Sequence, residues 1–286
     1  MGIVVQTNTL ALNSQKNLNK ATSSMNQAME RLSTGYKINK AADDAAGLFV
    51  ASTMTSQIGG SEKAKENANI GINLLQTAEG SLTTIQDNLQ RIRDLTVQAA
   101  NEVYSAESLS AMKLEVDARL AEIDRIASVA EFNGIKLLDG TKTSLTLQIG
   151  ANSDATKNSV TIENVFKDTK STTLKVDKNI YLNAFTGGNA DQIKNAQEYL
   201  AKISAALSTI STQRSNIGAY QSRLNSAIDT LTVNIENLSA ARSTIQDTDV
   251  AVESSNYIKN QILQQSTTAM LSAANQAPSI ALSLIS

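Results

Sequence analysis

Small and aliphatic residues recur at a 3-4 spacing through the last third of the chain. Between residues 193 and 245 the repeat is interrupted only by Arg214, Gln221 and Arg242. A repeat held over about seven heptads predicts one continuous helix of about 53 residues. At 1.5 Å per residue this helix is roughly 80 Å long. We expect the two arginines to pair with Glu or Asp across a bundle, or alternatively to set its register.

Shorter runs with the same spacing occur in the first half of the chain. They predict helices over residues 18–32, 75–99 and 109–126. Gly35 is a stop signal for the first helix, and Ser105 is a start signal for the third. A long helix cannot bury its apolar seam alone, so the second and third runs are its natural partners.

The middle of the chain has a different pattern. Residues 139–190 are rich in Gly, Asn, Asp, Ser, Thr and Lys, with short alternating pieces. The pieces 145–149 and 160–162 predict two strands, and 172–176 is a candidate for a third. So few strands do not make an independent domain. The predicted fold class is therefore mainly α, an elongated antiparallel helical bundle or coiled coil with a small β-hairpin elaboration in the middle of the chain.

Composition argues against an enzyme. The chain has no Cys, no His and no Trp, and its single proline is Pro278. These absences remove thiol nucleophiles, thiolate and imidazole metal ligands, and the commonest general base. Asp43 and Asp44 have no neighbouring second ligand, so we expect them to cap a helix or to pair with Arg31 or Lys40. We predict no catalytic, cofactor-binding or metal-binding residue.

Charge and hydropathy exclude two further classes of partner. The net charge of −2 gives no basic stripe for a nucleic acid. No run of 18 apolar residues is present, so we expect no membrane insertion. Residues 1–8 also lack the basic and apolar regions of a general secretory signal.

Both ends of the chain carry thin apolar stripes among many Asn, Gln, Ser and Thr residues. Such stripes leave apolar surface that one bundle does not cover, and surface of this kind usually marks an association site. The residues expected to serve assembly in the last stretch are Ile258, Ile262, Leu263, Met270, Leu271, Leu282 and Leu284.

Several motifs, in order, resemble those of bacterial flagellins. The first is RLSTGYKINKAADDAAGL at residues 31–48. The others lie at 88–101, 131–138, 260–271 and 274–278, and the resemblance extends over roughly 1–140 and 190–286. It implies a subunit that polymerises into the extracellular flagellar filament for swimming motility and is exported by the flagellar type III apparatus.

The resemblance also implies a division of the chain. Residues 1–45 and 250–286 would form the inner core of the filament, and 46–140 with 190–249 the helical bundle. Residues 141–189 would replace the large variable outer domain of longer flagellins.

The implied partners are further copies of the chain, flagellar cap and junction proteins, and an export chaperone at residues 235–285, with no cofactor. The resemblance places Arg91, Leu95 and Glu115 where flagellins that activate host Toll-like receptor 5 carry the same residue types. We favour contacts between subunits as their primary role. Two alternatives stay open for the whole chain, a hook–filament junction protein and a secreted coiled-coil effector or adhesin.

Overall fold

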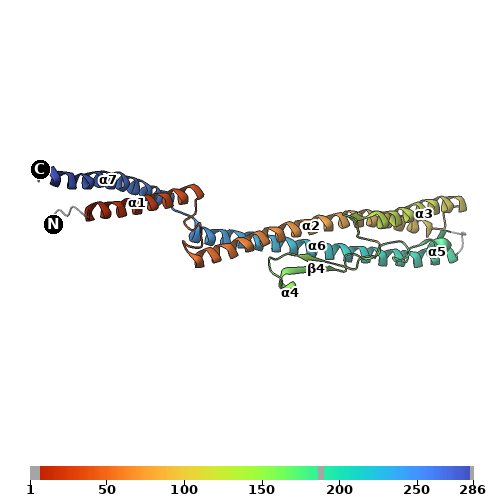
Figure 1. The fold of residues 1–286 in the computed structure, drawn as a ribbon. Helices are drawn as coiled ribbons and strands as arrows, with labels where there is room; N and C mark the ends of the chain where they lie inside the picture. Colours follow the sequence, from red (N-terminus) through yellow and green to blue (C-terminus); the bar gives the residue numbers. More distant parts are fainter. Residues whose placement is uncertain (1–6, 186–189, 284–286) are drawn as a thin grey trace. The chain divides into compact units, whose positions relative to one another are not determined.

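The computed structural model describes residues 7–185 and 190–283 (Figure 1). The chain divides into two compact units, Met1–Ser56 with Glu236–Ser286, and Gln57–Ile235. Two long helices, α2 (Ala45–Ala99) and α6 (Ala190–Gln246), contribute residues to both units. The mainly helical fold class is confirmed.

The first unit contains a pair of antiparallel helices, α1 (Thr9–Thr34) and α7 (Val250–Ser283), which lie side by side (Figure 1). At one end Asn8 Nδ2 donates to the carbonyl of Ala274, and at the other Arg31 Nη1 lies 3.8 Å from Glu253 Oε2. The buried residues of α1 are Ser14, Ala21 and Ala28. Because these small residues recur every seven positions on one face, the two helices can approach closely.

The ends of α1 and α2 follow from their capping residues. Gly35 adopts φ 77° and its N–H donates to the carbonyl of Arg31, which ends α1 as predicted. Asp43 Oδ2 accepts hydrogen bonds from the backbone N–H groups of Asn39 and Lys40, and Asp44 Oδ1 accepts from Gly47 N–H. Asp44 caps the start of α2 as predicted, whereas Asp43 closes the turn before it through backbone N–H groups.

The second unit is built from parts of α2 and α6 together with α3 (Ala106–Val129). Gln192 Nε2 donates to Ala99 O, and Arg214 Nη1 donates to Gln86 Oε1, so α2 and α6 run antiparallel. The buried residues of its core are largely those of the predicted apolar repeats. Its fully buried side chains include Leu75, Leu82, Ile85, Leu89, Ile92, Leu109, Val116, Ile123, Ile203, Ile210, Ile217 and Leu224.

The helix α2 begins thirty residues earlier than the sequence pattern indicated. It has 55 residues, whereas we predicted a helix from residue 75. Its first half buries the small residues Ala51, Ala64 and Ala68. Small side chains support close helix contact but give a weak hydrophobic period, which explains the missed start.

Two hairpins follow α3. Strands β1 (Glu131–Phe132) and β2 (Ile135–Lys136) are joined by Asn133 and Gly134, both with positive φ, in the two-residue turn typical of tight hairpins. Strands β3 (Ser144–Gln148) and β4 (Ser159–Glu163) pair antiparallel, with the short helix α4 (Ala155–Asn158) between them. The predicted strands at 145–149 and 160–162 are confirmed.

The third candidate strand, 172–176, is wrong. There the chain makes a turn in which Val176 N–H donates to Ser171 O, and Lys175 has φ 57°. Leu174 and Val176 are buried while Thr173 and Lys175 are exposed. This alternation imitates a strand, but it arises from a turn that lies against the helices.

Residues 164–177, here called the crossing segment, are fixed to the helices by polar and aromatic contacts. Asp124 of α3 accepts hydrogen bonds from Ser171 N–H at 2.7 Å and from Ser171 Oγ at 2.9 Å. The buried Tyr199 hydroxyl donates to Val176 O, and burial raises the pKa of Tyr199. The chain then continues through α5 (Lys178–Tyr181) and the 3-10 helix η1 (Leu182–Phe185). The ring of Tyr181 contacts the rings of Phe185 and Tyr199.

Candidate assembly and recognition surfaces

Arg91 and Glu115 form a two-pronged ion pair between α2 and α3. Arg91 Nε donates to Glu115 Oε1 at 2.7 Å, and Nη2 donates to Oε2 at 3.0 Å. The hydrogen bond from Arg91 lowers the pKa of Glu115, and the same contact raises the pKa of Arg91. The planar fork of Arg fits a carboxylate in this geometry, so the pair fixes α3 against α2.

A second arginine extends this surface. Arg119 Nη2 lies 3.8 Å from Glu115 Oε1, and Arg119 Nη1 donates to Oδ1 of the buried Asn88 at 3.3 Å. Glu115 is thus held between two guanidinium groups. The sequence pattern did not single out Asn88 or Arg119, because contacts between helices far apart in sequence leave no local period.

Leu95 does not share this surface. The structure brings Arg91 and Glu115 together, but the Leu95 side chain is 3% exposed and lies in the core. The exposed apolar residues nearest in sequence are Val97 on α2 and Leu114 on α3. A partner that contacts Arg91 on the folded unit therefore does not reach the buried Leu95 side chain.

Most of the apolar residues predicted to serve assembly are exposed on α7. Ile258, Ile262, Leu263 and Met270 have exposed side chains, and Leu271 is half-buried. Leu284 and the side chain of Leu282 lie outside the described residues. Ile258, Ile262 and Leu263 line a shallow groove of about 410 Å³ together with Ser255 and Lys259.

The other helix of the first unit has a similar outer surface. Leu10, Leu12 and Met29 of α1 are exposed, while the small residues of α1 face α7. Several large apolar side chains of this helix pair are therefore exposed, whereas Leu18, Met25 and Leu32 of α1 are half-buried. Exposed apolar surface of this kind is typical of an association site that further helices cover.

The seam arginines both find polar partners. Arg214 donates to Gln86 and lies 3.7 Å from Glu79 Oε1, which confirms the predicted pairing across the bundle. Arg242 Nη1 donates to the Thr55 hydroxyl at 3.3 Å, so it contacts a hydroxyl where a carboxylate was expected. Both arginines keep part of their side chain in solvent.

The described residues offer no arrangement for metal chemistry or membrane insertion. Over residues 7–185 and 190–283, no three or more Asp and Glu side chains gather where they could hold a metal ion. Within the same ranges, the length and hydropathy of every helix fall short of what a membrane crossing needs.

Comparison with known proteins finds relatives that match both helical halves of the chain. Residues 5–143 match the model of the bacterial flagellin N-terminal helical region, and residues 200–285 match that of the bacterial flagellin C-terminal helical region. The chain is 42% identical over 315 aligned residues to a flagellin of Xenorhabdus nematophila, covering 100% of both chains. It is 40% identical over 293 residues to the flagellar filament 33 kDa core protein of Treponema phagedenis, covering 99% of this chain and 100% of that one.

A solved structure shares the fold at much lower identity. A protein assigned as flagellar hook-associated, from Vibrio parahaemolyticus, matches 72% of this chain and 100% of its own with a TM-score of 0.60 and 13% identity. This likeness concerns the fold alone. The two filament proteins named above differ from this hook-associated protein in being about 40% identical to the chain over their whole length.

Proposed function

The chain belongs to the bacterial flagellin family, and on this basis we propose that it polymerises into the filament of the bacterial flagellum. It is a structural protein of motility that works outside the cell, and not an enzyme. The observation that supports polymerisation best is the outward position of Ile258, Ile262 and Met270 on α7.

Burial of that surface supplies the driving force for assembly. A fully buried Ile, Leu or Met side chain contributes roughly 1.5–3 kcal/mol relative to an exposed one. Leu10, Leu12 and Met29 of α1 add to the apolar surface of α7. Neighbouring copies that cover both helices would offset the entropy lost on association. We therefore propose residues 1–45 and 250–286 as the inner core of the filament.

The test is assembly of purified protein on sheared filament seeds, followed by electron microscopy. Full-length protein should form long filaments, and a variant that lacks residues 250–286 should form none. A variant with Ile258→Ser and Ile262→Ser keeps the helix length and should raise the concentration needed for assembly. Absence of filaments from the full-length protein, with a single small species in sedimentation, would contradict the proposal.

The same surface supports a chaperone proposal. Before assembly, the exposed groove at Ile258, Ile262 and Leu263 would be covered by an export chaperone that binds residues 235–285, and export would use the flagellar type III apparatus. Flagellar cap and junction proteins are the further proposed partners at the filament ends. Unchanged chaperone binding by the double variant Ile258→Ser and Ile262→Ser would contradict the assignment of the groove.

For Arg91 and Glu115 we propose contacts between subunits as the primary role, with recognition by Toll-like receptor 5 as the second. Both side chains are on the surface of the second unit, although they already bind each other. Arg91→Ala tested in a receptor reporter assay and in seeded assembly separates the roles. Loss of assembly with normal receptor activation supports the first role, and the reverse result supports the second.

A hook–filament junction protein is the remaining alternative within the same export system. The fold is compatible with it, as the 0.60 TM-score shows. The identities near 40% over whole flagellin chains favour the filament subunit. A secreted effector or adhesin would remain a stable monomer or small oligomer in the presence of seeds.

A further inference from the structure

We propose that the loop at the end of α2, residues 100–105, docks into a cavity beside α6 of a neighbouring copy. This tip loop carries Glu102 and Val103. The cavity lies between the crossing segment and residues 205–209 of α6. The inference rests on the proposed polymerisation and specifies one contact that holds the copies together.

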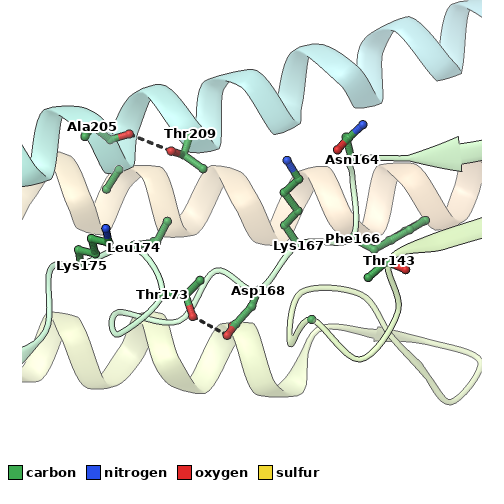
Figure 2. A pocket seen from close by; sticks show the side chains of 12 residues that line it. Thr143, Asn164, Phe166, Lys167, Asp168, Thr173, Leu174, Lys175, Ala205 and Thr209 are labelled. Carbon is green, nitrogen blue, oxygen red and sulfur yellow. Dashed lines mark hydrogen bonds between the residues drawn. The ribbon is translucent and has the colours of Figure 1, made fainter.

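The cavity has an apolar floor. Its volume is about 630 Å³, and its apolar lining consists of Phe166, Leu174, Ala205 and Ala206 (Figure 2). It exists because α6 presents small residues where the crossing segment passes. On the other side Gly140 lies close to Asp168, where a Cβ at residue 140 would be 2.9 Å from the Asp168 Cβ.

The charge available at the cavity is positive. Lys167 and Lys175 line it, both are exposed, and no ion pair or hydrogen bond engages either Nζ within the described residues. Figure 2 shows Lys167 extending from the crossing segment toward α6, with Lys175 beside Leu174. Asp168 also lines the cavity and accepts hydrogen bonds from Lys170 N–H and from the Thr173 hydroxyl. These donors are neutral, so the carboxylate keeps its charge and the two lysines leave the lining net positive. An occupant with an apolar side chain and a carboxylate fits this lining.

The tip loop offers that combination. Val103 is 79% exposed, the highest value among the exposed large hydrophobic residues of the described chain. Glu102 beside it is exposed and has no partner in the described structure. Residues 100–107 contain two glutamates and no Lys or Arg. The loop is held in shape by the Val103 N–H, which donates to Asn101 Oδ1, and by Ser105, which caps α3.

One copy cannot fill its own cavity. The end of α2 at Ala99 lies beside Gln192 of α6, through the hydrogen bond from Gln192 to the Ala99 carbonyl. The cavity begins at Ala205, which is about 20 Å further along α6 at 1.5 Å per residue. A contact that joins two different surfaces of one chain repeats from copy to copy and generates an open polymer.

Because the chain has no cysteine, the contact can be tested by disulfide formation between copies. Val103→Cys and Thr209→Cys are made in separate chains, mixed, assembled on seeds and oxidised. A disulfide between the two different chains is expected in filaments and not in the unassembled mixture. The matched control replaces Thr209→Cys by Ser222→Cys, an exposed position on α6 outside the cavity.

Two results overturn the inference: filaments without the 103–209 disulfide, or equal yields of the 103–209 and 103–222 disulfides. Failure of the unsubstituted protein to form filaments instead overturns the proposed function, so the two failures are distinguishable.

A charge exchange gives a second readout. Glu102→Lys and Lys167→Glu alone should each raise the concentration needed for seeded assembly about tenfold, which corresponds to 1.4 kcal/mol. The double variant should return to within about threefold of the original value because the two charges are opposite again. Circular dichroism checks that each variant keeps its helix content. A double variant that assembles as poorly as the singles overturns the pairing.

Discussion

Arg214 Nη1 donates to Gln86 Oε1 at 2.7 Å, about two helical turns away from the hydrogen bond between Gln221 and Glu79. The polar positions are seven residues apart on both helices. Arg214 also lies 3.7 Å from Glu79 Oε1, so it bridges the two polar positions of α2. We predict that this matched polar pair also fixes the register of the otherwise aliphatic seam.

The first prediction concerns this pair. Arg214→Ala should lower the free energy of unfolding by about 1–2 kcal/mol, because charged hydrogen bonds are lost at a partly exposed site. Chemical denaturation followed by circular dichroism measures the change. Arg223→Ala is the control, since Arg223 is exposed on the same helix without a partner in the described structure. It should change stability by less than about 0.5 kcal/mol. Equal effects would show that the seam pair has no special role.

A second prediction uses the lowered pKa of Glu115. Its ordinary value is 4.5, and the hydrogen bond from Arg91 holds the folded-state pKa below that. As pH falls below about 4.5, the unfolded chain binds a proton at this site before the folded chain does. The stabilisation from the pair is thus complete above that pH and is lost as pH falls through the lowered pKa.

The measurement compares the wild type with Glu115→Gln by denaturation between pH 7 and pH 3. The stability difference between the two proteins should be largest at pH 7 and shrink below pH 4.5. The control is Lys113→Gln on the same helix. Its stability difference from the wild type should stay constant between pH 7 and pH 3. A difference that is constant with pH would contradict the role of the ion pair.

Two helical glycines should respond in opposite directions to alanine. Gly218 of α6 has open space where a Cβ would be, so Gly218→Ala should stabilise by about 0.5–1 kcal/mol through helix propensity. At Gly71 of α2 the new Cβ would overlap the Leu147 side chain of β3. Gly71→Ala should therefore destabilise by roughly 1 kcal/mol despite the same propensity gain. Thermal unfolding of the two variants tests the sign, and stabilisation by both would contradict the packing of β3 on α2.

The close contact of α1 with α7 depends on small side chains. Ala28 is 1% exposed, so Ala28→Leu should separate the helices and cost about 1–3 kcal/mol in the helix pair. Seeded assembly should fall sharply as a result. Met29→Leu, at the exposed neighbouring position, conserves volume and is the matched control. Normal filaments from Ala28→Leu would show that this contact is not needed for assembly.

The sequence by itself determined the helical seams. The aliphatic repeat of residues 193–245 appears in the structure as α6, which spans 57 residues, and Gly35 and Ser105 end and begin helices as predicted. These features are local, because periodicity and capping depend on neighbours within a few residues. The family motifs likewise follow from residue order alone.

Only the tertiary structure decided which faces are covered. Leu95 is four residues from Arg91 and so shares its general side of α2, yet packing within the second unit buries Leu95 and leaves Arg91 at its edge with Glu115. The alternation at 172–176 belongs to a turn because the helices bury Leu174 and Val176. The cavity beside α6 depends on where the crossing segment is anchored by Asp124. These outcomes rest on contacts between residues far apart in the chain, and periodicity carries no information about which neighbour will cover a given face.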